Sequence, residues 1–122
     1  MSKIIDTNMA IRYMVQDDYD KALKVKEVID LGAYIIPEII PELIYALNKG
    51  YKVPRRETGW AISDLLDDVD VVDKNFYLSA LKLYRESKLD YVDCVLVMKK
   101  VIMKDQIFTF DKELILTLEK YA

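Results

Sequence analysis

Four acidic residues of this sequence lie within or directly after apolar runs. Isoleucine, leucine, valine or phenylalanine stands beside each of them, and the four are Asp6, Glu42, Asp93 and Asp111. A carboxylate in apolar surroundings needs a hydrogen bond, an opposite charge or a metal ion to offset its lost hydration. Several carboxylates close together also repel one another, and one or two divalent cations between them would remove that penalty.

The residue types that the chain lacks narrow the chemistry further. There is no histidine and only one cysteine, which excludes a Ser-His-Asp triad, a histidine general base and a multi-cysteine zinc site. Oxygen ligands favour Mg²⁺ or Mn²⁺, and a metal-activated water suits hydrolysis in a site without a histidine base. We interpret Cys94 as a small hydrophobic residue that packs in the core, not as a catalytic thiol.

Each acid alone also has a structural interpretation. Asp6 and Asp111 follow apolar segments, where an aspartate commonly caps the next helix. Glu42 could lie in the first turn of a helix, where its negative charge interacts favourably with the helix dipole. Asp93 is harder to explain in this way, because aspartate has a poor propensity for helix interiors and Asp90 is the better candidate for the N-cap. Asp90 and Asp93 are three residues apart and share a helix face, so their charges repel unless a cation lies between them.

The elements that must position these acids alternate along the chain. Strands are expected at 3–6, 33–36, 69–72 and 106–110, and helices at 9–15, 19–31, 38–50, 55–66, 75–87, 90–103 and 112–121. This alternation predicts an α/β domain with a mainly parallel sheet of four or five strands flanked by helices. Ligand sites in such sheets lie beyond the carboxyl ends of the strands, where Asp6 and Asp111 are expected.

Composition indicates one folded domain over residues 1–122. The chain is 52% hydrophobic and 32% charged, with three glycines and three prolines, which excludes a disordered or low-complexity protein. There is no apolar run long enough to span a membrane and no secretory signal at the N-terminus, so a cytoplasmic protein is expected. The formal net charge of -3 gives no global attraction for nucleic acid, so a nucleic-acid partner would need a local basic patch or bound cations.

Four short motifs, in this order, resemble those of the PIN-domain ribonucleases and, more narrowly, the VapC-type toxins of toxin–antitoxin pairs. Each motif alone is short, but together they extend over nearly the whole chain. The four are Ile5-Asp6-Thr7-Asn8, Pro41-Glu42-Leu43-Ile44, Leu89-Asp90-Tyr91-Val92-Asp93 and Phe108-Thr109-Phe110-Asp111.

The resemblance implies a single PIN-like domain that is a metal-dependent endoribonuclease and leaves 5′-phosphate and 3′-hydroxyl ends. It also implies an antitoxin protein that covers the site, and a homodimer. The implied catalytic and metal-binding acids are Asp6, Glu42, Asp93 and Asp111, with Asp90 as an additional acid and Asn8 and Thr109 as supporting residues. The implied cofactor is Mg²⁺ or Mn²⁺.

An RNA substrate would need positive charge near these acids. The candidates are Arg12, Lys49, Lys52, Arg55, Arg56 and Lys112, although residues 49–56 could equally form a solvated loop and helix start. Two other functions stay open. One is a catalytically inactive binding module of the same fold that acts through protein contacts. The other is a structure-specific DNA nuclease, although such nucleases are generally longer than this chain.

Overall fold

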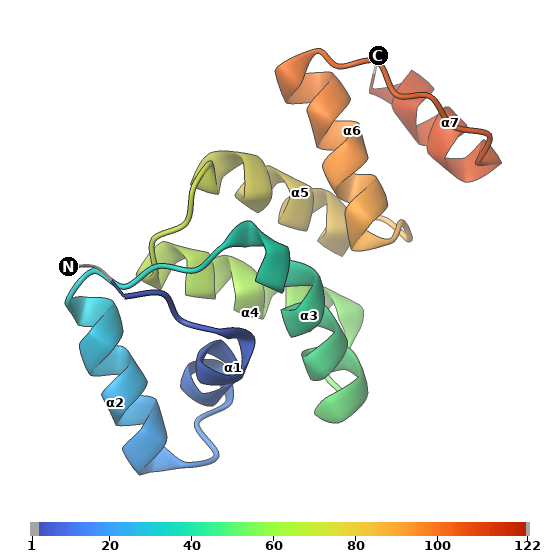
Figure 1. The fold of residues 1–122 in the computed structure, drawn as a ribbon. Coiled ribbons are helices and arrows are strands. Elements are labelled where there is room, and N and C mark those ends of the chain that lie inside the picture. Colours follow the sequence, from blue (N-terminus) through green and yellow to red (C-terminus); the bar gives the residue numbers. More distant parts are fainter. Residues whose placement is uncertain (1–2, 122) are drawn as a thin grey trace.

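Helices form most of the structure, a computed structural model that describes residues 3–121 (Figure 1). In that part of the chain the α-helices are α1 (Thr7–Val15), α2 (Tyr19–Asp30), α3 (Ile40–Tyr45), α4 (Arg55–Asp68), α5 (Lys74–Glu86), α6 (Tyr91–Met103) and α7 (Lys112–Lys120). A 3-10 turn, η1 (Pro37–Ile39), leads into α3, and a π-helical turn, η2 (Ala46–Gly50), follows it. Six of the helices predicted from the sequence are confirmed, with ends within two residues of the expected positions. The helix expected at 38–50 is divided into the 3-10 turn η1, the short α-helix α3 and the π-helical turn η2.

Local signals explain where these helices begin and end. The side chains of Asp6 and Asp18 cap α1 and α2, and Gln16 ends α1 in the left-handed conformation at φ 57°. Pro41 lies in the first turn of α3, where a missing N–H costs no helix hydrogen bond. These signals are local in sequence, which is why the positions of most helices could be predicted from it.

The predicted parallel sheet is wrong. Within residues 3–121 the β-pairing consists of two isolated parallel bridges, Ile4 to Tyr34 and Tyr34 to Asp70, with no ladder that would make a strand. The backbone N–H of Ile5 and that of Ile35 donate hydrogen bonds of 2.9 Å to the carbonyl oxygens of Tyr34 and Asp70. Three of the four expected strands therefore meet side by side, but each pairs over too few residues to form a sheet.

The fourth expected strand, residues 106–110, has no regular secondary structure. Its two phenylalanines pack against each other with ring centroids 5.3 Å apart, but Phe108 and Phe110 are 88% and 87% exposed. The apolar run suggested a buried strand, whereas the structure gives its backbone no neighbouring edge to pair with. A run of apolar residues indicates a tendency to be buried, but it does not specify the partner.

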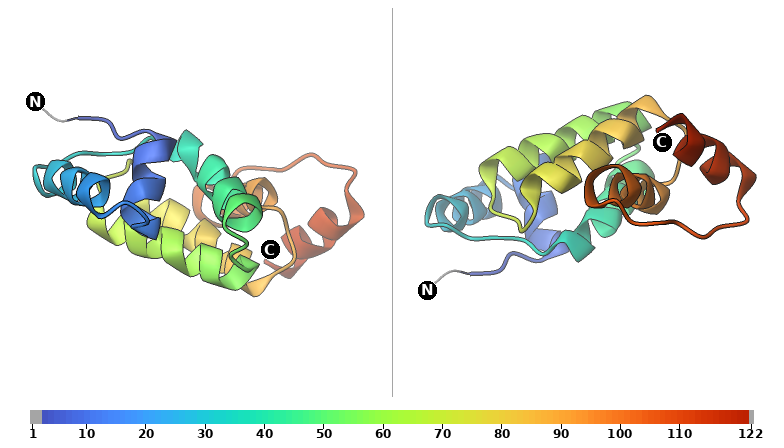
Figure 2. Two further views of the ribbon diagram at one scale, coloured as in Figure 1. Left: turned by 90° about the horizontal axis from the view of Figure 1, so that it is seen from below. Right: turned by 90° about the horizontal axis from the view of Figure 1, so that it is seen from above.

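The helices are arranged along one direction, with α2 at one end and α7 at the other (Figures 1 and 2). Helices α4 and α5 pack side by side, α5 also packs on α6, and α1 packs on α2. The core between them is closed by fully buried aliphatic side chains, among them Ile35, Ile40, Leu43, Ile62, Leu66, Leu81 and Val97. In the part of the chain described, no helix has the length and apolar character needed to cross a membrane.

Candidate functional site

Asp6 lies at the N-terminus of α1 and caps that helix. Its Oδ1 atom accepts a hydrogen bond of 2.9 Å from the backbone N–H of Met9, and the residue is exposed. The capping interpretation of Asp6 is therefore confirmed. The cap also fixes the position of this carboxylate directly after the bridge between Ile4 and Tyr34.

Glu42 lies in the first turn of α3 and is joined to the start of α1. The hydroxyl of Thr7 donates a hydrogen bond of 2.5 Å to Oε1 of Glu42. Because Thr7 follows Asp6 directly, this contact brings the first two predicted acids into one neighbourhood. The sequence did not indicate this role of Thr7, although the residue stands between Asp6 and Asn8 in the first motif.

Asp93 lies in the first turn of α6 and is partly buried. Partial burial raises the pKa of its carboxyl, and the negative charges of Asp111 and Asp90 raise it further. Asp90 is the N-cap residue of α6 by position, but its side chain makes no capping hydrogen bond. Like charges placed together in this way are stabilised by a cation between them.

Asp111 is the N-cap residue of the last helix, α7, and its backbone contacts Thr109. Its Oδ1 atom caps α7 by accepting a hydrogen bond of 2.9 Å from the N–H of Leu114. The backbone N–H of Asp111 donates a bond of 3.0 Å to the hydroxyl of Thr109. Thr109 thus orients the backbone of Asp111 and does not contact its carboxylate.

The predicted acids fall into two groups. The N-terminal acid group consists of Asp6 and Glu42, linked through Thr7, and the C-terminal acid group consists of Asp93 and the two acids whose charges raise its pKa, Asp90 and Asp111. Their carboxylate oxygens are the donors that Mg²⁺ and Mn²⁺ prefer. However, no three acidic, cysteine or histidine side chains among residues 3–121 lie close enough together to hold a metal ion. The donor chemistry fits such an ion, whereas the present placement of the side chains does not complete a ligand set.

Asn8 lies on α1 and faces a groove beside Asp6. The groove has a volume of about 340 Å³, with an apolar floor and a basic rim. Its floor contains Ile4, Ile5, Met9, Val25 and Val28, and its rim carries Lys3, Arg12, Lys21 and Lys24. The sequence analysis missed the lysines of this rim, although Lys21 and Lys24 are three residues apart on one predicted helix and so share a face.

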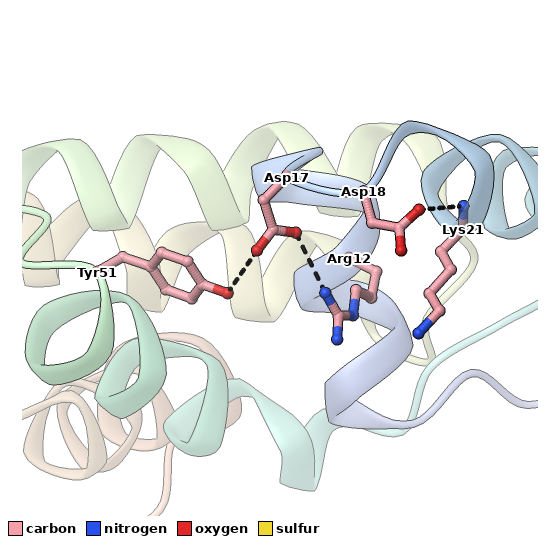
Figure 3. Close-up of polar contacts among 5 residues, drawn as sticks. All are labelled: Arg12, Asp17, Asp18, Lys21 and Tyr51. Carbon is pink, nitrogen blue, oxygen red and sulfur yellow. Dashed lines mark hydrogen bonds and ion pairs between the residues drawn. The ribbon is translucent and has the colours of Figure 1, made fainter.

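Arg12 is an ion-pair partner in this structure. Its Nη1 atom lies 3.3 Å from Oδ1 of Asp17, and the hydroxyl of Tyr51 donates a bond of 3.4 Å to the other oxygen of Asp17 (Figure 3). Asp18, the next residue, accepts a bond of 3.1 Å from the backbone N–H of Lys21. These contacts hold the turn between α1 and α2 and connect it to the segment after η2.

The remaining cationic candidates divide by exposure. Three of them are exposed near the junction of η2 and α4: Lys49 in η2, Lys52 after it and Arg56 in the first turn of α4. Lys112 is exposed beside Asp111. Arg55 differs from them because it is half-buried and its guanidinium donates hydrogen bonds to the backbone carbonyl oxygens of Tyr84 and Leu89.

Cys94 is fully buried one residue after Asp93, which confirms its interpretation as a packing residue. Burial raises the pKa of its thiol to about 11, and a contact with the hydroxyl of Ser87 opposes that shift only in part. A thiol with such a pKa is protonated at neutral pH and is a poor nucleophile.

Comparison with known proteins gives one match. The sequence model of the family described as PIN domain matches residues 3–118, which is nearly the whole chain. No curated protein and no solved structure matches the chain. The match includes all four motifs that carry the predicted acids, and it does not distinguish a toxin from other members of the family.

Proposed function

This chain belongs to the PIN domain family, whose members are generally metal-dependent nucleases, and we propose that it is a metal-dependent endoribonuclease. The observation that carries the proposal is the family match over residues 3–118, which includes the motifs of Asp6, Glu42, Asp93 and Asp111. The pKa of the Asp93 carboxyl, raised by partial burial and by the charges of Asp111 and Asp90, supports an acidic site that a bound cation would stabilise. The N-terminal acid group adds a second pair of carboxylates from the same family motifs.

In this proposal Asp6, Glu42, Asp93 and Asp111 hold Mg²⁺ or Mn²⁺, with Asp90 as an additional acid. When bound, such an ion activates water and offsets charge on the attacked phosphate. The residues of the chain supply the rest: Thr7 orients Glu42, and Thr109 orients the backbone at Asp111. Asn8 is a supporting residue beside Asp6.

Exposed cations provide the contacts with RNA. We assign this role to Lys49, Lys52 and Arg56, which lie in and after the end of the helical segment that carries Glu42. Lys112, beside Asp111, has the same role. Such a patch offsets the net charge of -3 locally, because phosphate contacts depend on nearby lysine and arginine and not on the overall charge. Arg12 is the other candidate, and its guanidinium would release Asp17 when it binds a phosphate group.

The groove supports a toxin of the VapC type that is held by an antitoxin. Its apolar floor and basic rim are complementary to a segment that combines apolar and acidic side chains. Because the groove adjoins Asp6 through Ile5 and Asn8, a bound segment would obstruct the N-terminal acid group. A homodimer that acts on RNA in the cytoplasm completes this proposal.

The first test is cleavage of a labelled, structured RNA with Mg²⁺ or Mn²⁺, with and without EDTA. The expected result is metal-dependent cleavage that is lost in Asp93→Asn and kept in Asp67→Asn, a matched change of an exposed aspartate on α4. Absence of cleavage and of metal binding in the wild type would reject the nuclease and favour a binding module. Preferential cleavage of DNA would reject RNA as the substrate.

A further inference from the structure

Arg55, the first residue of α4, connects this helix through its side chain to α5 and to the segment before α6. Its Nε atom donates a hydrogen bond of 2.9 Å to the carbonyl oxygen of Tyr84, and Nη2 donates another to that of Leu89. The guanidinium carbon also lies 3.9 Å from the centroid of the Tyr84 ring. One planar group therefore holds the last turn of α5 and the segment before α6 together.

One of the two carbonyl groups, that of Leu89, lies directly before the C-terminal acid group in the chain. Tyr84 is in the last turn of α5, and Leu89 stands directly before Asp90, the N-cap residue of α6. The backbone N–H of Cys94 donates a bond of 3.0 Å to the carbonyl of Asp90, which begins the helix that carries Asp93. A shift of the Leu89 carbonyl would therefore move both acids.

Neither carbonyl has an easy alternative partner. Tyr84 and Leu89 are only 3% and 7% exposed, so water does not readily replace the guanidinium. The thiol of Cys94 lies 3.9 Å from the Leu89 carbonyl and is a weak donor. Only arginine offers two donors in a rigid fork and a flat face for the ring at once, so lysine is not an equivalent replacement.

The far side of Tyr84 is fixed as well. Its hydroxyl accepts a hydrogen bond of 3.2 Å from the side-chain amide of Asn48, and the Oδ1 atom of Asn48 accepts one of 2.7 Å from the hydroxyl of Thr58. Thr58 is fully buried one turn after Arg55 on α4. The ring that Arg55 covers is thus immobilised, so the guanidinium is held against a rigid surface.

We propose that Arg55 is a positioning residue that fixes the segment 87–90 and thereby the places of Asp90 and Asp93. The inference rests on the proposed function, in which these carboxylates bind the metal ion. It replaces the expected role of Arg55 as an RNA contact with a role inside the protein.

The test compares Arg55→Ala and Arg55→Lys with Arg85→Ala. Arg85 is a matched control because its guanidinium carbon lies 3.7 Å from the centroid of the Trp60 ring and its Nη1 donates a bond of 2.9 Å to Ser63, away from α6. Three quantities are measured: the Mn²⁺ affinity by calorimetry, kcat and KM on RNA, and hydrogen exchange of the amides of residues 90–94.

We expect Arg55→Ala to weaken Mn²⁺ binding and lower kcat by about tenfold or more, with KM for RNA unchanged. Arg55→Lys should recover part of this loss, because lysine can reach one carbonyl but not both. Exchange at residues 90–94 should be faster in both variants than in the wild type. Arg85→Ala should leave the Mn²⁺ affinity, kcat and exchange at these residues unchanged.

A higher KM with unchanged kcat and exchange would overturn the inference and make Arg55 an RNA contact. Equal effects of Arg85→Ala and Arg55→Ala on Mn²⁺ affinity would also overturn it, because the effect would then reflect general stability. If the wild type neither cleaves RNA nor binds Mn²⁺, the proposed function fails. Hydrogen exchange then still decides whether Arg55 holds the segment, and Arg55→Lys supplies that measurement if Arg55→Ala does not fold.

Discussion

The hydroxyl of Thr7 donates a hydrogen bond to the carboxylate of Glu42, a residue 35 positions later in the chain. The contact joins the first turn of α1 to the first turn of α3, two helices that the sequence separates by the whole of α2. It makes Asp6 and Glu42 neighbours and fixes the orientation of the Glu42 carboxylate. The N-terminal acid group therefore depends on a side chain that is not itself an acid.

Thr7→Val should reduce cleavage of RNA by about tenfold, because Glu42 loses the donor that orients it. The free energy of unfolding should fall by less than about 1 kcal/mol, since Glu42 is exposed and water can replace the hydroxyl. Urea denaturation and cleavage kinetics measure the two effects. Thr117→Val, which removes a hydroxyl bonded to the backbone of α7, is the control and should leave cleavage unchanged. Full activity in Thr7→Val would show that the hydrogen bond between Thr7 and Glu42 does not contribute to RNA cleavage.

Asp6→Ser separates helix capping from metal binding at one position. Serine is as good an N-cap as aspartate, so stability should be retained, whereas Asp6→Ala should lose about 1 kcal/mol. Both variants should lose metal-dependent cleavage, because serine lacks the carboxylate. Thermal unfolding and the RNA cleavage assay distinguish the two roles.

The control for Asp6→Ala is Asp18→Ala, which removes the equivalent cap from α2. It should lower stability by about the same amount and leave cleavage intact in the folded protein. If Asp6→Ser cleaves RNA as the wild type does, Asp6 is a capping residue only, and the four-acid ligand set is wrong.

The helices and their ends could be predicted because their signals lie within a few residues of one another. Asp6 and Asp111 were recognised as possible caps from the apolar segments before them, and both caps form. The same local patterns did not predict the sheet correctly. Apolar runs at 33–36 and 106–110 favour burial, but whether they pair along a ladder depends on neighbours that are distant in sequence.

The candidate site, like the fold, could be predicted only as far as local sequence patterns determine it. The acids were selected by their types and motifs, whereas their grouping into Asp6 with Glu42 and Asp93 with Asp111 depends on the packing of helices. The partners of Arg55 lie 29 and 34 positions away, so no local pattern separates it from its exposed neighbour Arg56. The residue type alone does not show whether an arginine is exposed to solvent or donates hydrogen bonds to two buried carbonyl groups.

Asp93→Asn should make the metal-free protein more stable at neutral pH. The pKa of Asp93 is raised above its model-peptide value of 3.8 by burial and by Asp111 and Asp90, so the folded state binds more protons than the unfolded state. The wild type therefore loses stability as the pH rises through this range, and the variant does not. Urea denaturation between pH 3 and pH 7 should show a difference that grows with pH.

Two comparisons test this interpretation of Asp93. Glu113→Gln, which changes an exposed first-turn acid of α7, should lower stability by about 0.3–1 kcal/mol at neutral pH, the opposite sign, because only the favourable helix-dipole interaction is lost. Mn²⁺ at 100 times its Kd should stabilise the wild type by about 2.7 kcal/mol and the Asp93→Asn variant by less. Lower stability of metal-free Asp93→Asn at neutral pH would contradict the repulsion between these acids.

Arg56→Ala should weaken RNA binding in a salt-dependent way. Each phosphate contact to single-stranded RNA contributes about 0.7 to the slope of log K against log salt concentration, so losing one contact should reduce the slope by about that amount. Binding to a labelled RNA, measured by fluorescence anisotropy at several salt concentrations in EDTA, gives the slope without cleavage. Lys26→Ala on α2, whose amine lies 2.8 Å from Asp30, is the control and should leave the slope unchanged. An unchanged slope in Arg56→Ala would remove the first turn of α4 from the RNA interface and direct the search to Lys112 and the rim of the groove.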